Sequence, residues 1–188
     1  TEALQLFTES RILAEQNNFY LYQLDIILNL STLHLQQENY IQTEDHLNEA
    51  EIIAMTIDAK IKLPELYRLK AELNLAHGEL DQAQANLAQS LDLAQSMRMK
   101  LEKGKSLRIQ GLLYQQQGEY AAALDAFQGS LMRVKDDVYE TALTLYALGQ
   151  CLTVAPDLDM GTEMTTQQQA ERYLLEAETI FEKLSIVR

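Results

Sequence analysis

Three histidines are the side chains of this chain best suited to hold a transition metal. A zinc site on a helix usually shows two histidines one turn apart, as in His-Glu-x-x-His, and His34, His46 and His77 have no such spacing. We expect His34 to be a packed core residue. His77 precedes Gly78 and is expected at the end of a helix, where exposed carbonyl groups favour a cation. The histidines therefore predict no metal centre.

Carboxylates and glycines also form no recognisable catalytic or ion-binding motif. Asp157 and Asp159 begin like a calcium-binding loop, but Thr162 stands where that loop needs Gly, and Gln168 stands where it needs Glu. The sequence has no Gly-rich phosphate loop, nucleophile elbow or dinucleotide fingerprint. We therefore expect a protein that is not an enzyme and that has no catalytic, cofactor-binding or metal-binding residues.

Charge and cysteine content limit the partners and the location. A formal net charge of −13 argues against direct binding of nucleic acid, which needs clustered Lys and Arg to replace counterions. The acidic surface is either simply solvated or steers a basic partner. Cys151, the single cysteine, is expected to be a small buried hydrophobe in a reducing, cytoplasmic protein. No apolar run approaches the length that crosses a bilayer, so no membrane partner is expected.

The elements that position these residues follow a pattern that returns every forty residues. A small residue, a bulky one four positions later, and small ones three and seven positions beyond that share one helical face, which another helix can approach closely. A fixed period of this size indicates a stacked array whose units bury their apolar faces against their neighbours. The four positions hold, in turn, Ala3, Thr43, Ala83 and Ala123; Phe7, Leu47, Leu87 and Phe127; Ser10, Ala50, Ser90 and Ser130; and Ala14, Ala54, Ala94 and Val134.

Composition and turn residues predict an all-α fold. Pro and Gly are few, and no run alternates apolar and polar residues as a strand would. Each unit reads as two helices and a short turn. Gly78 and Gly118 stand where a first helix ends and are expected in the left-handed conformation, and Asn39 is expected to form the corresponding turn of an earlier unit.

We expect one continuous solenoid of antiparallel helix pairs over residues 1–188, an α-α superhelix with about nine helices. The chain starts inside a helical pattern, and we expect it to be a fragment of a longer protein. The expected parts are the second helix of a truncated unit at 1–17, full units at 19–57, 63–97 and 99–136, and a last unit at 138–186 with a loop insertion at 156–165.

The units resemble the tetratricopeptide repeat (TPR). The motif of that family has a Gly or Ala and a Tyr along its first helix, a Gly at the turn, and Ala, an aromatic residue and Ala on its second helix. The usual spacing of the family is about six residues shorter, so the helices here are expected to be longer by about 9 Å per unit. The residues that match are Gly111, Tyr114, Gly118, Tyr120, Ala123 and Phe127 in the closest copy, Tyr67, Ala71, Gly78, Ala83 and Leu87 in a second, and Ser31, Tyr40 and Ala50 in a third.

The forty-residue period and the ending at 177–184 are similar to the TPR regions of bacterial regulators such as the MalT-like transcription activators. This resemblance implies a non-enzymatic module that binds a protein or peptide within a larger signalling or transcription-regulating protein. Alternatively, a peptide or small effector bound to the array signals to an attached output domain. A third hypothesis is a homodimer through the ends of the array.

The resemblance also implies that the first helix of each unit lines a concave groove. Arg68, Lys105 and Arg108 fall on that face of an otherwise acidic chain. They either bind a carboxylate of an extended peptide, because Arg offers paired donors, or form ion pairs with Glu65 and Glu72. The predicted groove residues are Arg68, Glu72, Lys105, Arg108, Leu112, Gln115, Tyr146 and Gln150.

Overall fold

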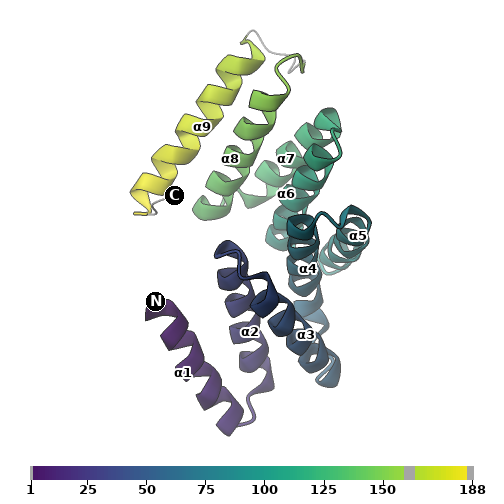
Figure 1. The fold of residues 1–188 in the computed structure, drawn as a ribbon, viewed down its shortest axis with the longest axis vertical. Coiled ribbons are helices and arrows are strands. Elements are labelled where there is room, and N and C mark those ends of the chain that lie inside the picture. The colour runs from purple at the N-terminus through teal and green to yellow at the C-terminus, as the bar shows by residue number, and fades with distance from the viewer. Residues whose placement is uncertain (1, 159–163, 186–188) are drawn as a thin grey trace. The chain divides into compact units, whose positions relative to one another are not determined.

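A computed structural model describes residues 2–158 and 164–185, apart from the side chain of Ala3. In this part of the chain every regular element is a helix, which confirms the all-α prediction (Figure 1). Half of the loop predicted at 156–165, namely residues 159–163, lies outside the described residues. The helices are α1 (Glu2–Gln16), α2 (Tyr20–Gln36), α3 (Tyr40–Thr56), the 3-10 helix η1 (Lys60–Lys62), α4 (Leu63–His77), α5 (Leu80–Ser96), α6 (Lys100–Gln116), α7 (Tyr120–Val134), α8 (Val138–Val154) and α9 (Thr166–Lys183).

A left-handed residue ends a helix at every twentieth position from residue 18 to residue 118. The next residue then donates its backbone N–H to a carbonyl five positions back, as Glu79 does to Asn74 at 2.8 Å, which is the bond of a Schellman cap. The left-handed conformation predicted for Gly78 and Gly118 is confirmed, whereas in the earlier unit Glu38 adopts it and not Asn39. The φ angles are 56° at Asn18, 59° at Glu38, 53° at Asp58, 75° at Gly78, 57° at Arg98 and 78° at Gly118.

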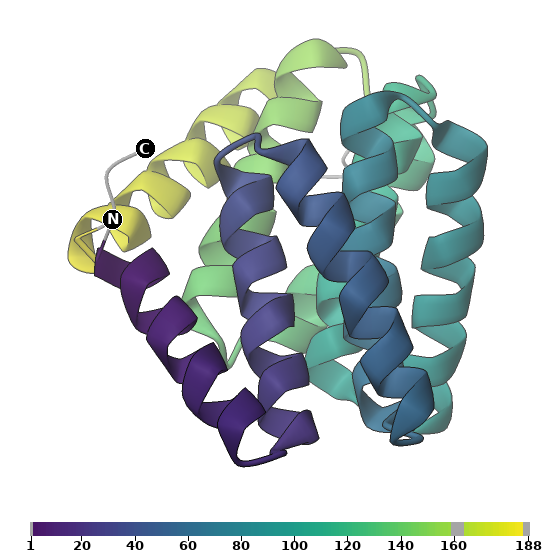
Figure 2. The ribbon, with the colours of Figure 1, turned by 60° about the horizontal axis from the view of Figure 1, so that its bottom comes forward.

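The chain divides into two compact units, residues 1–93 and 94–188. In the first unit α2 and α3 form an antiparallel pair, with α1 against α2 and α4 against α3 (Figure 2). Leu24, Leu47 and Leu66 are at most 1% exposed in its core. Each such Leu contributes about 1.5–3 kcal/mol through burial, which explains why the helices keep their apolar stripes turned toward one another.

In the second unit α6 pairs with α7, α7 packs against α8, and α8 runs antiparallel to α9 (Figure 1). Two helical glycines allow close approach at these contacts. A Cβ at Gly111 would lie 2.5 Å from the Phe127 ring, and a Cβ at Gly149 would lie 2.7 Å from Leu174. Phe127 is fully buried, so its ring occupies the space that Gly111 leaves.

The forty-residue pattern marks the buried face, as predicted. In α3, α5 and α7 all twelve residues of the pattern are at most 2% exposed. In α1, which packs mainly on α2, Phe7 is half-buried and Ser10 is exposed. The small residues thus serve close helix packing where helices flank both sides.

Cys151 lies fully buried in α8, within the core formed by α7 and α8. Burial raises the pKa of its thiol, because an apolar surrounding disfavours the thiolate. The prediction of a buried, hydrophobe-like cysteine is confirmed.

Candidate functional site

A cluster of three charged side chains joins α6 to α8 in the second unit. The Lys105 Nζ lies 3.6 Å from Oε1 of Glu140, and the Arg108 Nη2 lies 3.5 Å from its Oε2. Lys105 and Arg108 stand three residues apart, so they occupy one face of α6. Glu140 is only 8% exposed. Two cations therefore contact one buried carboxylate.

Glu140 is held in place by the start of α8. Its backbone N–H donates a 3.0 Å hydrogen bond to Oδ1 of Asp137, the side-chain cap of that helix. Thr144, one turn later, donates its hydroxyl to the Glu140 carbonyl at 2.8 Å. A carboxylate in the first turn also interacts favourably with the helix dipole. These hydrogen bonds hold the backbone of Glu140 at the start of α8, and its carboxylate reaches both cations from there.

The remaining predicted residues of α6 and α8 differ in accessibility. Leu112 is half-buried and packs on the core of the second unit. Tyr146 is also half-buried and meets Phe181 of α9 edge-on, with ring centroids 6.5 Å apart. Gln150 is exposed. The Oε1 atom of Gln115 is buried and accepts no hydrogen bond from the described residues. On this face of α6 and α8, Leu112 and Tyr146 therefore provide apolar packing, and the Gln115 side chain provides an amide oxygen that accepts no hydrogen bond from the described residues.

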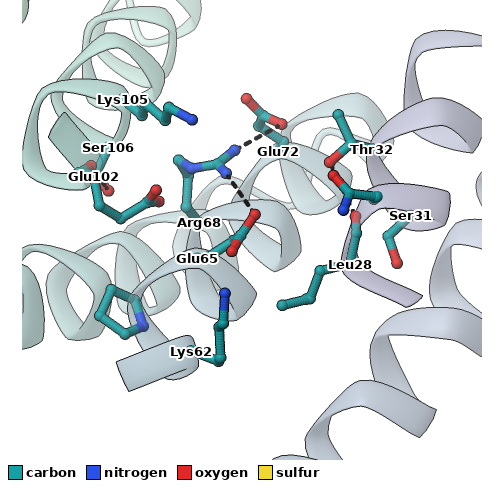
Figure 3. Close-up of polar contacts among 12 residues, drawn as sticks. Leu28, Ser31, Thr32, Lys62, Glu65, Arg68, Glu72, Glu102, Lys105 and Ser106 are labelled. Carbon is teal, nitrogen blue, oxygen red and sulfur yellow. Dashed lines mark hydrogen bonds and ion pairs between the residues drawn. The ribbon is translucent and has the colours of Figure 1, made fainter. Parts of the chain in front are cut away.

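Arg68 and Glu72 belong to α4 of the first unit. The Arg68 guanidinium lies between Glu65 and Glu72 of the same helix, at 3.9 Å and 3.6 Å, and Arg68 is 5% exposed (Figure 3). The ion pairing that the sequence predicts with Glu65 and Glu72 is therefore observed for Arg68. Lys105 and Arg108 both contact Glu140, which sequence reasoning did not single out.

A second site that the sequence missed lies in the first unit. His34 and His46 stack across the α2–α3 pair, with ring centroids 5.3 Å apart. They share a pocket of about 420 Å³ with Arg11, Thr8 and Glu15 of α1. His34 lies four residues before the loop at Glu38 and His46 lies eight residues after it. Because both are close to the loop that joins α2 to α3, the sequence could have predicted that they lie near each other.

The electrostatics of this pocket disfavour a protonated His46. Burial lowers its pKa most, and the neighbouring His34 and Arg11 lower it further, while Asp45 opposes them. The Nδ1 atom of His34 is buried without a hydrogen-bond partner in the described part of the chain. Arg11 forms ion pairs with Glu15 and Glu49, both at 2.7 Å. The pocket thus combines an arginine with two imidazoles.

His77 ends α4, as predicted, and its ring meets Tyr40 edge-on at 5.4 Å. Within residues 2–158 and 164–185, no three His, Cys, Asp or Glu side chains gather as a metal ion would require. None of the helices described there combines the length and the apolarity that a bilayer crossing demands. Comparison with protein-family models and with curated proteins found no match to this chain.

Proposed function

We propose that this protein is a TPR-like interaction module whose α6–α8 face binds an acidic segment of a protein partner. The residues that carry the family resemblance support this proposal, because Gly111, Ala123 and Phe127 come together where α6 meets α7. In this proposal the module is non-enzymatic, serves a regulatory or scaffold role, and works in the reducing cytoplasm.

The observation that carries the proposal is the pair of cations on Glu140. The Lys105 Nζ lies 3.6 Å from Glu140, and an ammonium group carries three N–H donors, so a carboxylate of a peptide can approach Lys105 as well. Lys105 is the accessible member, with 23% of its side chain exposed, against 13% for Arg108. Tyr146 and Gln150 on α8 add an aromatic surface and an amide for an extended peptide.

The test is binding of a fluorescent oligoglutamate peptide, followed by anisotropy at low salt. We expect Lys105→Gln to weaken binding about tenfold, since it removes one charge-assisted contact. Lys60→Gln is the matched control, because Lys60 lies in the other unit with 71% of its side chain exposed. Equal losses in both variants would show that the peptide responds only to overall charge, and the assignment of this face would fail.

The pocket beside His34 and His46 favours the alternative function, an effector sensor. Its volume of about 420 Å³ lies within the range of pockets that hold small molecules. The Nδ1 atom of His34, which is buried without a hydrogen-bond partner among the described residues, would suit a small polar effector. A ligand at one hundred times its Kd stabilises the folded state by about 2.7 kcal/mol, so thermal unfolding with a set of small polar molecules tests this function. An unchanged Tm throughout the set would remove the support.

Homodimerisation is the remaining partner hypothesis, and exposed apolar side chains of α1 and the start of α2 support it. Leu13 is 60% exposed and Tyr22 is 66% exposed. Exposed apolar surface often marks protein contacts. Sedimentation at increasing concentration tests the hypothesis, and Leu13→Glu should abolish any dimer that forms there.

A further inference from the structure

Four cations line a pocket at the N-terminal end of α6. The pocket has a volume of about 210 Å³, and Arg98, Lys100, Lys103 and Arg133 lie around it. The whole chain has only 15 Lys and Arg residues and a net charge of −13, so these four form a marked local concentration of positive charge. We propose that this basic pocket binds the phosphate group of a phosphate monoester.

Three segments of the second unit build the basic pocket. Arg98 lies in the turn after α5, Lys100 and Lys103 lie in the first turns of α6, and Arg133 lies in the last turn of α7. Gly104 brings α6 and α7 together at this end, because a Cβ there would lie 2.6 Å from Val134 and 3.0 Å from the Cβ of Arg133. The close helix contact thus places Arg133 beside the start of α6.

The basic pocket is separate from the face around Glu140. Residues two apart on an α-helix point about 200° apart, so Lys103 and Lys105 leave α6 in different directions. Lys103 donates a short hydrogen bond to the Gln95 side chain, whereas Lys105 pairs with Glu140. One helix therefore presents two independent sites, and this inference does not depend on the proposed peptide-binding function.

The charge balance of the basic pocket favours a dianion. Asp136 pairs with Lys100 at 3.3 Å, both side chains being exposed, and with this carboxylate the cluster keeps a formal charge of +3. The partners of Lys103 and Arg133 are neutral: the Gln95 side chain, and the Gly129 carbonyl at 2.7 Å. A guanidinium carries five N–H donors, so Arg133 retains donors beyond that one bond.

The ligand class follows from shape and donor type. A phosphate monoester has three terminal oxygens and a charge of about −2, which matches two guanidinium groups and two ammonium groups better than a single carboxylate does. Met99, which precedes α6, supplies no side-chain cap, so the first-turn N–H groups add to the positive field. The volume suits a phosphate with a short stem, below the roughly 300 Å³ of pockets for larger ligands.

The experiment is a titration of the full chain with inorganic phosphate, followed by the backbone amide signals in NMR, with chloride holding the ionic strength constant. We expect saturable shifts at residues 100–103. Arg98→Gly should weaken binding about tenfold by removing one charge-assisted contact. It should leave the fold intact, because Arg98 has a φ of 57°, which Gly adopts readily. Lys103→Gln should weaken binding similarly, and Lys105→Gln should not change it.

Either of two results would overturn the inference: no saturable shift at residues 100–103, or the same Kd for phosphate in Arg98→Gly and in the unmodified chain. Phenyl phosphate and a phosphoserine peptide then distinguish the sources of the group. A peptide that binds more tightly indicates a phosphorylated protein partner, and equal affinities indicate a small phosphate ester. Oligoglutamate binding that is weakened by Lys105→Gln and unchanged by Arg98→Gly would support two separate sites on α6.

Discussion

His46 makes the first unit sensitive to acid. Its pKa is lowered by burial, by His34 and by Arg11, so between that lowered value and the ordinary 6.5 the folded chain holds fewer protons at this site than the unfolded chain. Where the unfolded state binds more protons, the free energy of unfolding rises with pH. The contribution of neutral His46 to the free energy of unfolding is complete above pH 6.5, and it is lost as the pH falls through 6.5 toward the pKa of His46 in the folded state.

We therefore expect His46→Gln to flatten the decline in the free energy of unfolding between pH 7 and pH 5, measured by urea titration at each pH. Asp45→Asn provides the opposite change, since Asp45 is the group that raises the pKa of His46. That variant should make the decline steeper. If the unmodified chain and both variants share one pH profile, His46 does not control the acid response.

Among the elements, the contact between α6 and α7 has a testable steric requirement. Gly111→Ala would press a methyl group to within 2.5 Å of the buried Phe127 ring, which costs about 1–3 kcal/mol and cancels or exceeds the ~1 kcal/mol gain in helix propensity. Gly129→Ala meets its nearest neighbour at 3.5 Å, an ordinary contact, and should stabilise by about 0.5–1 kcal/mol. Urea unfolding of the two variants measures both effects.

The same experiment in a Phe127→Leu background tests the cause. A smaller side chain at residue 127 should reduce the penalty of Gly111→Ala, because the two sites are in contact and their effects are coupled. A penalty that is unchanged by Phe127→Leu would mean that the methyl group meets some other obstacle.

The turns between helices offer a reciprocal pair of substitutions. Glu38 and Gly118 occupy equivalent left-handed positions, with φ of 59° and 78°. Glu38→Gly should stabilise by about 0.5 kcal/mol, because relief of the left-handed strain exceeds the entropic cost of Gly. Gly118→Ala should destabilise by about 1 kcal/mol through the backbone alone, since no atom lies within 4 Å of its added Cβ. Thermal unfolding measures both effects. If both substitutions raise the Tm, or both lower it, the strain argument is wrong.

The parts of this structure that sequence could predict are those encoded within one helix or turn. Ala123 and Phe127 are four residues apart, so their shared face follows from helical geometry alone. Glu140 stands 32 residues after Arg108, and its pairing depends on α8 packing beside α6, which no local spacing encodes. The left-handed conformation of Glu38 was not predicted, because Glu rarely adopts it. Its position in the twenty-residue period of the turns, and not its side chain, determines this conformation.

At the scale of the whole molecule, stability should spread from one helix to its neighbours, because each helix of such an array contacts mainly those beside it. In the second unit α7 packs on α6 and α8, while α9 packs on α8. A defect in α7 should therefore affect α6 and α8 directly and α9 only through α8. Global cooperativity would instead make all four helices respond equally.

Ala123→Asp tests this expectation, since Ala123 is fully buried in α7 and an unpaired charge there cannot remain folded in place. Amide hydrogen exchange should show the largest loss of protection in α6, α7 and α8, and a smaller loss in α9. Ala121→Asp is the matched control, because Ala121 is exposed near the start of the same helix, where a carboxylate is favourable. Uniform loss across α6 to α9 would contradict neighbour-by-neighbour stabilisation, and normal protection in Ala123→Asp would contradict the assignment of the buried face.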